Sequence, residues 1–224
     1  MGIKDWPEAD RPREKLQRLG PGALGDSELL AIFLRTGYRG ASAVDLGRHL
    51  LQRFGSLGAL LAASPEQLCD SPGLGPAKHA QLAAVFELAR RALEEGLRAR
   101  EVLDDPARVK DFLRLTLQGR QRECFLAIFL DARHRVLAVE ELFEGTLSQA
   151  PVYPREVARR ALVHNAAAVV FAHNHPSGAV DPSAADVQVT RALRSALEPL
   201  DVRVLDHIVV GREGAVSLAE RGLA

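Results

Sequence analysis

The chain has 224 residues, of which 47% are hydrophobic and 26% charged, and its 29 basic residues balance its 29 acidic ones. This length and apolar content suffice for one large domain or two small ones, which excludes intrinsic disorder as a description of the whole chain. The balanced charge excludes the overall positive field that usually accompanies strong nucleic-acid binding, so any such contact must be local.

The first hundred residues are predicted to be helical. From Asp26 the segment DSELLAIFLRTG predicts a helix that Asp26 caps and Gly37 ends. Its buried face is expected to carry Leu29, Leu30 and Phe33. Three further helices are expected from Ser42 to Gly55, from a capping box that opens at Ser64, and after the glycine-rich turn that begins at Ser71.

A change of pattern predicts a domain boundary beyond residue 100. Asp104, Asp105 and Pro106 break the long helix, and β-type runs follow. CFLAIFLD and VLAVEELF flank the turn DARHR as a hairpin, whose first strand is apolar enough to be central. Helices are predicted for PREVARRALVHNA and SAADVQVTRALRSAL, and strands for AAVVFAH, VRVLDHIVVG and AVSLAE. We therefore expect an all-helical domain over residues 1–100 and an α/β domain with a mixed sheet over residues 107–224.

A candidate metal site follows the strand AAVVFAH. His173 and His175 are two residues apart, so both imidazoles can point to the same face of the sheet. Asp186 lies in the first turn of the next predicted helix, from which its carboxylate could return to the same place. Two imidazoles and one carboxylate leave the fourth position of a tetrahedral Zn²⁺ for water, as in catalytic zinc sites. Cys69 and Cys124 are the only cysteines and lie far apart, which excludes a cysteine-based zinc cluster and a disulfide framework.

Each of these features also has a purely structural interpretation. A histidine at a strand end is usually a polar terminus, and Ser183 with Asp186 forms a capping box that needs no metal. Two histidines in register, a turn and an acid at the next helix start are together improbable as an accident of capping. The interpretations are also compatible, since Ser183 can cap the helix that aims Asp186.

The stretch HNHPSGAVDPSAAD resembles the signature of the JAMM (JAB, MPN-type) metalloproteases, in which ten residues separate H-x-H from Asp. With the downstream VLDHIVVG it is similar to the RadC family in particular, in which a helix-hairpin-helix segment precedes the JAMM domain. The resemblance covers nearly the whole chain. It implies a cytidine-deaminase-like mixed sheet, a zinc site at His173, His175 and Asp186, and stabilisation of an oxyanion by Ser183.

The resemblance also implies a glutamate that acts as general base ahead of the H-x-H motif. Glu123, at the start of the first core strand, has that place, and Glu140 and Glu156 are the competing acids. A base there would take a proton from the water on the metal, whose pKa the metal lowers to about 7, and pass it to the leaving group. The alternative for Glu123 is an ordinary exposed residue at a strand edge.

Two other polar residues lie near the motif. His207 interrupts an apolar strand and either lines the same cleft or bonds a buried carbonyl. Asn174 should point away from the ligands, which favours a structural role. The spelling HNH at residues 173–175 is a coincidence, because HNH nucleases take these residues from well-separated places. The H-x-E and P-C-x-x-C motifs of nucleobase deaminases are absent.

The segment SPGLGPAKHAQL resembles the second half of a helix-hairpin-helix motif, whose backbone N–H groups meet a DNA phosphate. Gly73 and Gly75 would allow close approach and Lys78 would add charge. Such turns also serve only to let helices cross tightly, and His79 stands where these motifs usually carry a small residue. We expect any DNA binding to be weak and independent of sequence.

The sequence therefore predicts a zinc-dependent hydrolase of amide or isopeptide bonds, acting on a peptide or protein that the sequence does not identify. The alternatives are a metal-dependent nuclease in DNA repair or recombination and a DNA-associated scaffold with a structural metal. A run of about 18 apolar residues and the layout of a signal peptide are both absent. We therefore expect a cytoplasmic bacterial protein without a membrane contact.

Overall fold

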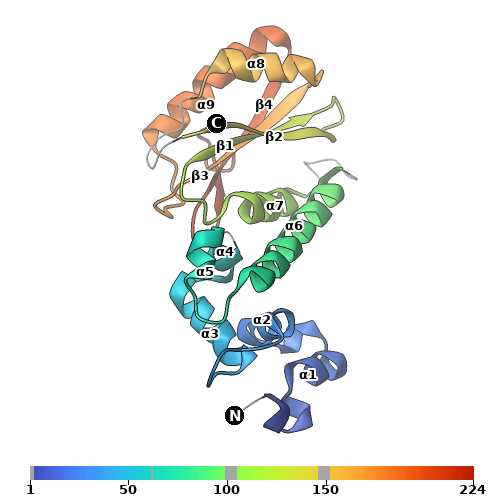
Figure 1. Cartoon of the computed structure of the whole chain (residues 1–224). Coiled ribbons are helices and arrows are strands. Elements are labelled where there is room, and N and C mark those ends of the chain that lie inside the picture. The colour runs from blue at the N-terminus through green and yellow to red at the C-terminus, as the bar shows by residue number, and fades with distance from the viewer. Residues whose placement is uncertain (1–2, 62, 99–104, 146–151) are drawn as a thin grey trace. The chain divides into compact units, whose positions relative to one another are not determined.

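The computed structural model describes residues 3–61, 63–98, 105–145 and 152–224 (Figure 1). The α-helices are α1 (Pro12–Leu19), α2 (Asp26–Leu34), α3 (Ala43–Phe54), α4 (Leu57–Leu61), α5 (Pro65–Cys69), α6 (Pro76–Arg98), α7 (Pro106–Leu117), α8 (Pro154–Val163) and α9 (Ala184–Leu197). The strands are β1 (Cys124–Leu130), β2 (Val136–Glu144), β3 (Ala168–Asn174), β4 (Arg203–Val210) and β5 (Ala215–Ser217). Short 3-10 helices span Ile3–Asp5, Glu8–Asp10, Pro21–Ala23 and Glu198–Leu200.

The chain divides into two compact units, Met1–Leu88 and Ala89–Ala224, so the division falls inside α6. It lies earlier than the boundary expected from the sequence because Leu93 and Leu97, near the end of α6, pack into the core of the second unit. Of the three expected helix breakers, Asp104 lies outside the described residues. Asp105 caps α7, a helix absent from the predictions above, by accepting a hydrogen bond from the backbone N–H of Arg108.

The first unit is helical, as its capping signals predicted. Ser42 and Ser64 each accept a hydrogen bond from the backbone N–H three residues later, and Gly55 ends α3 with φ of +80°. These are the N-caps and the left-handed C-cap that favour such residue types. The core of this unit is made of leucines from α2 to α6: Leu30, Leu34, Leu46, Leu50, Leu60, Leu68, Leu74 and Leu82.

The expected cap of α2 was wrong, and of the three residues expected on its buried face only Leu30 is buried. Gly25, not Asp26, is the N-cap, because the Glu28 carboxylate accepts a hydrogen bond from the Gly25 N–H at 2.9 Å. Phe33 is 42% exposed, and the buried side chains are Leu30, Ala31 and Leu34. The close crossing with α3 selects this face, since a Cβ on Gly47 would meet the Ser27 carbonyl oxygen at 2.7 Å.

The second unit is built on a five-stranded mixed sheet in the order β2-β1-β3-β4-β5. Only β3 and β4 are parallel, and the hairpin β1–β2 is antiparallel, as the sequence predicted. Strand β1 is paired on both sides and fully buried, which explains its continuous apolar run. Within the described ranges, no helix combines the length and apolar character that crossing a membrane requires.

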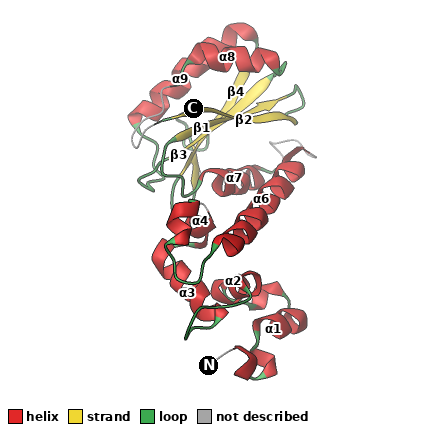
Figure 2. Cartoon of the chain, in the orientation of Figure 1, coloured by secondary structure: helices red, strands yellow, loops and turns green. Residues whose placement is uncertain are grey.

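Helices cover both faces of this sheet (Figure 2). On one face α7 packs against alternate residues of the strands, including Leu126, Val170 and Ile208. On the other face α8 and α9 pack against the intervening residues, including Phe125 and Phe171. Strand alternation places His173 and His207 on this second face, next to α9. The candidate metal ligands therefore lie where β3 ends beneath the start of α9.

Candidate metal centre

The end of β3 holds the two candidate histidine ligands. His173 lies opposite Phe125 of β1 and Val209 of β4. His175 follows the strand, and its N–H donates to the Val210 carbonyl at 3.0 Å, so the sheet holds its backbone as well. Both imidazoles reach the same side of the sheet, with their Nε2 atoms 3.0 Å apart.

A capping box at the start of α9 brings in the third ligand. The Ser183 hydroxyl oxygen accepts from the Asp186 N–H at 3.2 Å, and the Ser183 N–H donates to Asp186 Oδ2 at 2.6 Å. Such a reciprocal pair fixes both the helix start and the carboxylate. The capping and ligand interpretations of these residues are thus compatible in the structure. The role of Ser183 toward an oxyanion stays a prediction.

The three side chains converge on one point. Asp186 Oδ1 lies 3.2 Å from His173 Nε2, and Asp186 Oδ2 lies 3.4 Å from His175 Nε2. Among the described residues these three form a group that could hold a metal ion. Ligand atoms around tetrahedral zinc at about 2.0–2.1 Å lie roughly 3.3 Å from one another, so the observed separations suit such an ion.

Exposure differs among the three ligands in a way that suits an open site. The His173 side chain is 2% exposed, whereas those of Asp186 and His175 are 13% and 16% exposed. Solvent therefore reaches the group from the side of Asp186 and His175. A catalytic metal needs this access for water and substrate.

The hydrogen bonding of His175 also leaves its Nε2 atom available to bind a metal ion. Its Nδ1 lies 3.1 Å from the Ala179 carbonyl oxygen, so Nδ1 must carry a proton to bond there. In the neutral ring, Nε2 then presents a lone pair to the point where the three side chains meet. A partner for the second ring nitrogen is the usual arrangement for metal-binding histidines.

Contacts within the group shift the pKa values of Asp186 and His175. Burial raises the pKa of Asp186, but the imidazoles of His173 and His175, which donate to the carboxylate when they are protonated, outweigh it, and the pKa lies well below its ordinary value. The hydrogen bond to Asp186 is the main cause that raises the pKa of His175, and the charge of Glu123 acts in the same direction. Asp186 is therefore anionic at neutral pH, which is the charge state that a metal-binding carboxylate needs.

Glu123 lies immediately before β1, at the edge of this group. The register that pairs Phe125 with His173 brings Glu123 opposite His175 when it is continued by two pairs of residues. The residue is half-buried rather than fully exposed, and its carbonyl oxygen accepts from the Gly145 N–H at 2.7 Å. Its assignment as the general base stays a prediction.

The competing acids have other partners. Glu140 on β2 accepts hydrogen bonds from Arg160 and lies 2.8 Å from His164 Nε2. The hydrogen bond from Arg160 is the main cause that holds the pKa of Glu140 below its ordinary value. Glu156, in the first turn of α8, pairs with Arg159 at 2.9 Å. Both carboxylates belong to ion pairs with arginine.

Asn174 has the structural role that strand alternation predicted. Its side-chain oxygen accepts from the Cys124 N–H at 2.8 Å, and its amide donates to the carbonyls of Arg122 and Arg120 at 3.0 and 3.3 Å. These bonds lie on both sides of Glu123 in the chain. Asn174 therefore holds the segment that carries the candidate base.

His207 is buried and lies next to His173. Its Nε2 lies 2.8 Å from His173 Nδ1, and its Nδ1 lies 2.6 Å from the Thr190 hydroxyl. Burial is the main cause that lowers the pKa of His207 well below its ordinary value, so the ring is neutral. The sequence did not single out Thr190. The feature of the sequence that could have indicated Thr190 is its position four residues after Asp186, on the same face of α9.

The candidate DNA-binding turn precedes α6 in the first unit. Gly73 has φ of +83°, and a Cβ there would lie 2.8 Å from the Tyr38 Cβ, whereas nothing lies within 4 Å of a Cβ on Gly75. The Lys78 ammonium donates to the carbonyls of Thr36, Gly37 and Gly73 at 2.6, 3.4 and 2.8 Å. Lys78 therefore connects this turn to the end of α2, and its contact with DNA stays a prediction.

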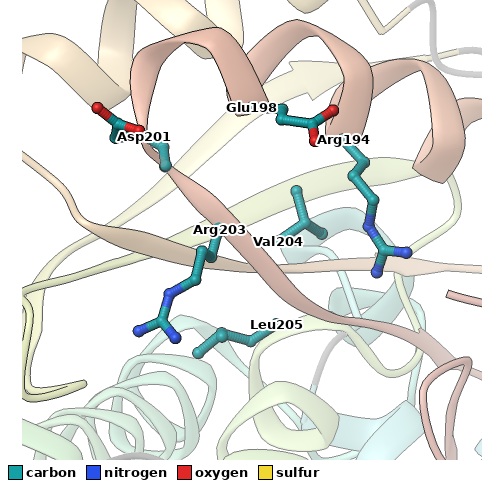
Figure 3. Close-up of a pocket in the computed structure, with 7 residues that line it drawn as sticks. Arg194, Glu198, Asp201, Arg203, Val204 and Leu205 are labelled. Atoms are coloured by element: carbon teal, nitrogen blue, oxygen red, sulfur yellow. The ribbon is translucent and has the colours of Figure 1, made fainter.

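A separate surface hollow of about 560 Å³ lies at the start of β4 (Figure 3). Arg194 and Arg203 extend along it on either side of Val204. The metal ligands lie at the opposite end of the sheet, because the parallel strands β3 and β4 both end near His175. The described residues that line the hollow are Arg194, Glu198, Asp201, Val202, Arg203, Val204 and Leu205. None of the candidate metal ligands is among them.

Both units of the chain are similar to known protein families. The RadC-like JAB domain matches residues 103–223, and the UPF0758 N-terminal domain matches residues 3–80. A UPF0758 protein of Nitrosospira multiformis is 62% identical over 100% of both chains. UPF0758 proteins of Ralstonia nicotianae and Aeromonas hydrophila are 58% and 57% identical over 99% of each chain. These relatives are bacterial, and their names state no activity.

Proposed function

The chain belongs to the RadC family of proteins with a JAB domain, and from this premise we propose that it is a zinc-dependent hydrolase of amide or isopeptide bonds. The observation that carries the proposal is the convergence of His173, His175 and Asp186 in a group that opens to solvent on one side. Three protein ligands with an accessible side are typical of catalytic zinc, whereas structural zinc usually has four protein ligands. The same observation argues against a scaffold whose metal is only structural.

Each residue around the group has a defined task in this proposal. When bound, a zinc ion supplies Lewis-acid polarisation of a carbonyl and lowers the pKa of water. Glu123 accepts the proton that the attacking water loses and later gives it to the leaving amine. The Ser183 hydroxyl uses its oxygen as an acceptor for the Asp186 N–H, so its proton is free to bond a developing oxyanion.

Metal removal is the direct test. After chelation and removal of the chelator, the protein should no longer hydrolyse peptides or isopeptide-linked peptides, and one equivalent of Zn²⁺ should restore hydrolysis. Liquid chromatography and mass spectrometry of a peptide library measure both steps. The same preparations are incubated with nicked and single-stranded DNA. Zinc-dependent cleavage of DNA but not of peptides would establish the nuclease instead, and peptide hydrolysis that persists without metal would refute the proposal.

We also propose that any DNA contact is made by the backbone around Gly75 and the start of α6. The space in front of Gly75 is open, whereas carbonyl oxygens hold the Lys78 ammonium. Fluorescence anisotropy of the full chain should give a Kd of ~10⁻⁴ to 10⁻⁶ M at physiological salt, and tighter binding at low salt. Gly75→Asp should weaken binding through repulsion of phosphate, with Gly75→Ala as the uncharged control. Absence of binding at low salt, or equal binding by Gly75→Asp, would leave the turn as a packing element.

A further inference from the structure

Behind the three ligands, a continuous series of hydrogen bonds leads from His173 back to the helix that carries Asp186. His173 Nδ1 lies 2.8 Å from His207 Nε2, and His207 Nδ1 lies 2.6 Å from the Thr190 hydroxyl oxygen. The Thr190 hydroxyl lies 2.6 Å from the carbonyl oxygen of Asp186, one turn earlier in α9. Two of the three ligands are thus joined through His207 and Thr190.

The direction of every hydrogen bond in this series follows from the position of the Thr190 hydroxyl proton. The Thr190 hydroxyl donates its only proton to the Asp186 carbonyl, which can only accept. Its oxygen must therefore accept from His207, which places the His207 proton on Nδ1. His207 Nε2 is then an acceptor, so His173 must carry its proton on Nδ1. In that tautomer His173 Nε2 presents its lone pair to Asp186 and His175.

Packing holds the two rings in the positions that these bonds require. His207 and Thr190 are each 1% exposed, so water cannot compete for their hydrogen bonds. The Phe125 ring stacks on His173 with an interplanar angle of 12° and meets His207 edge-on at 5.4 Å. Phe171 meets His207 edge-on from a second direction at 6.2 Å. The His207 ring therefore lies between two phenylalanines and two hydrogen-bond partners.

We propose that Thr190 and His207 are positioning residues that select the metal-binding tautomer of His173 and align it with Asp186. The inference rests on the proposed metal site and adds residues that do not contact the ion. In metal sites generally, loss of an outer hydrogen-bond partner of a ligand lowers metal affinity by about 10- to 100-fold. Here the same series connects a ligand on β3 with the backbone of a ligand on α9.

Paired variants of the full chain separate this role from general packing. Thr190→Val keeps the side-chain shape but removes the hydroxyl, and it should weaken Zn²⁺ binding by about 10- to 100-fold. Thr190→Ser keeps the hydroxyl and should restore affinity to within a few-fold of the wild type. Thr116→Val is the matched control, because Thr116 donates the same type of bond to the Phe112 carbonyl at 2.8 Å in α7. Competition with a chromophoric chelator measures each affinity.

A second pair of variants and a spectroscopic measurement complete the test. His207→Gln can still accept from His173 Nδ1 and should bind metal more tightly than His207→Leu. The visible spectrum of the Co²⁺-loaded protein reports ligand geometry, and it should change in Thr190→Val but not in Thr116→Val. Circular dichroism of the metal-free variants identifies any that do not fold, and the remaining pair then decides the outcome.

The outcomes distinguish failure of this inference from failure of the proposed function. If the wild type binds no Zn²⁺, the metal site itself is refuted. If the wild type binds Zn²⁺ and folded Thr190→Val and His207→Leu bind it equally well with an unchanged Co²⁺ spectrum, only the positioning role is overturned. Weakened binding in Thr190→Val with recovery in Thr190→Ser supports the inference.

Discussion

The double variant His173→Ala/His175→Ala is expected to contain no zinc, whereas the wild-type protein should contain close to one Zn²⁺ per chain. The substitutions leave Asp186 as the only one of the three converging ligands, and one carboxylate cannot retain the ion at micromolar protein concentration. The single variants His173→Ala, His175→Ala and Asp186→Ala should also lose metal, because a site with three protein ligands tolerates little subtraction. Elemental analysis of dialysed protein measures the content.

Two further variants show whether such a loss is specific. His134 lies in the hairpin turn and pairs with Arg203 at 2.9 Å, so His134→Ala should keep its zinc. Ser183→Ala removes a helix cap, which costs about 1 kcal/mol, but leaves all three ligands in the chain. It should therefore lower the melting temperature without abolishing metal binding. Undiminished zinc in the double histidine variant would remove the site from consideration.

The sequence could predict that His173, His175 and Asp186 lie together, because the position of each depends on local structure. Strand alternation alone puts His173 and His175 on one face, and a capping box of adjacent residues orients Asp186. The hairpin, the central position of β1 and the cap at Ser183 depend on signals within a few residues. A local pattern was therefore sufficient to bring these side chains together.

Features that depend on contacts between distant segments could not be predicted in this way. Lys78 bonds the carbonyls of Thr36 and Gly37 across more than 40 residues of chain, and nothing in SPGLGPAKHAQL indicates those partners. His207 reaches Thr190 from another element, so the sequence left two interpretations of His207 open. The buried face of α2 likewise depends on how closely α3 approaches. Tertiary packing determines all three of these features.

Glu123→Gln is expected to keep its zinc while peptide hydrolysis falls by about 10² to 10⁴-fold. Glutamine keeps the shape and hydrogen-bonding reach of glutamate but cannot accept a proton at neutral pH. Asn174 and Gly145 bond the backbone on either side of Glu123 and at its carbonyl, so the substitution should leave the segment in place. Steady-state rates with a peptide substrate, together with elemental analysis of the same preparation, measure both quantities.

Glu140→Gln and Glu156→Gln are the controls, and both should keep metal and activity. Glu140→Gln should nevertheless lower the melting temperature at pH 7, because it breaks the pairing with Arg160 and His164. The pKa of Glu140 is lower in the folded than in the unfolded chain, chiefly through the hydrogen bond from Arg160, so its stabilisation is present above the unfolded pKa of about 4.3. It is lost as the pH falls through the lower folded pKa, so the difference from the wild type should shrink in acid. If either control, rather than Glu123→Gln, is loaded with zinc but inactive, the base is that residue and the assignment of Glu123 is wrong.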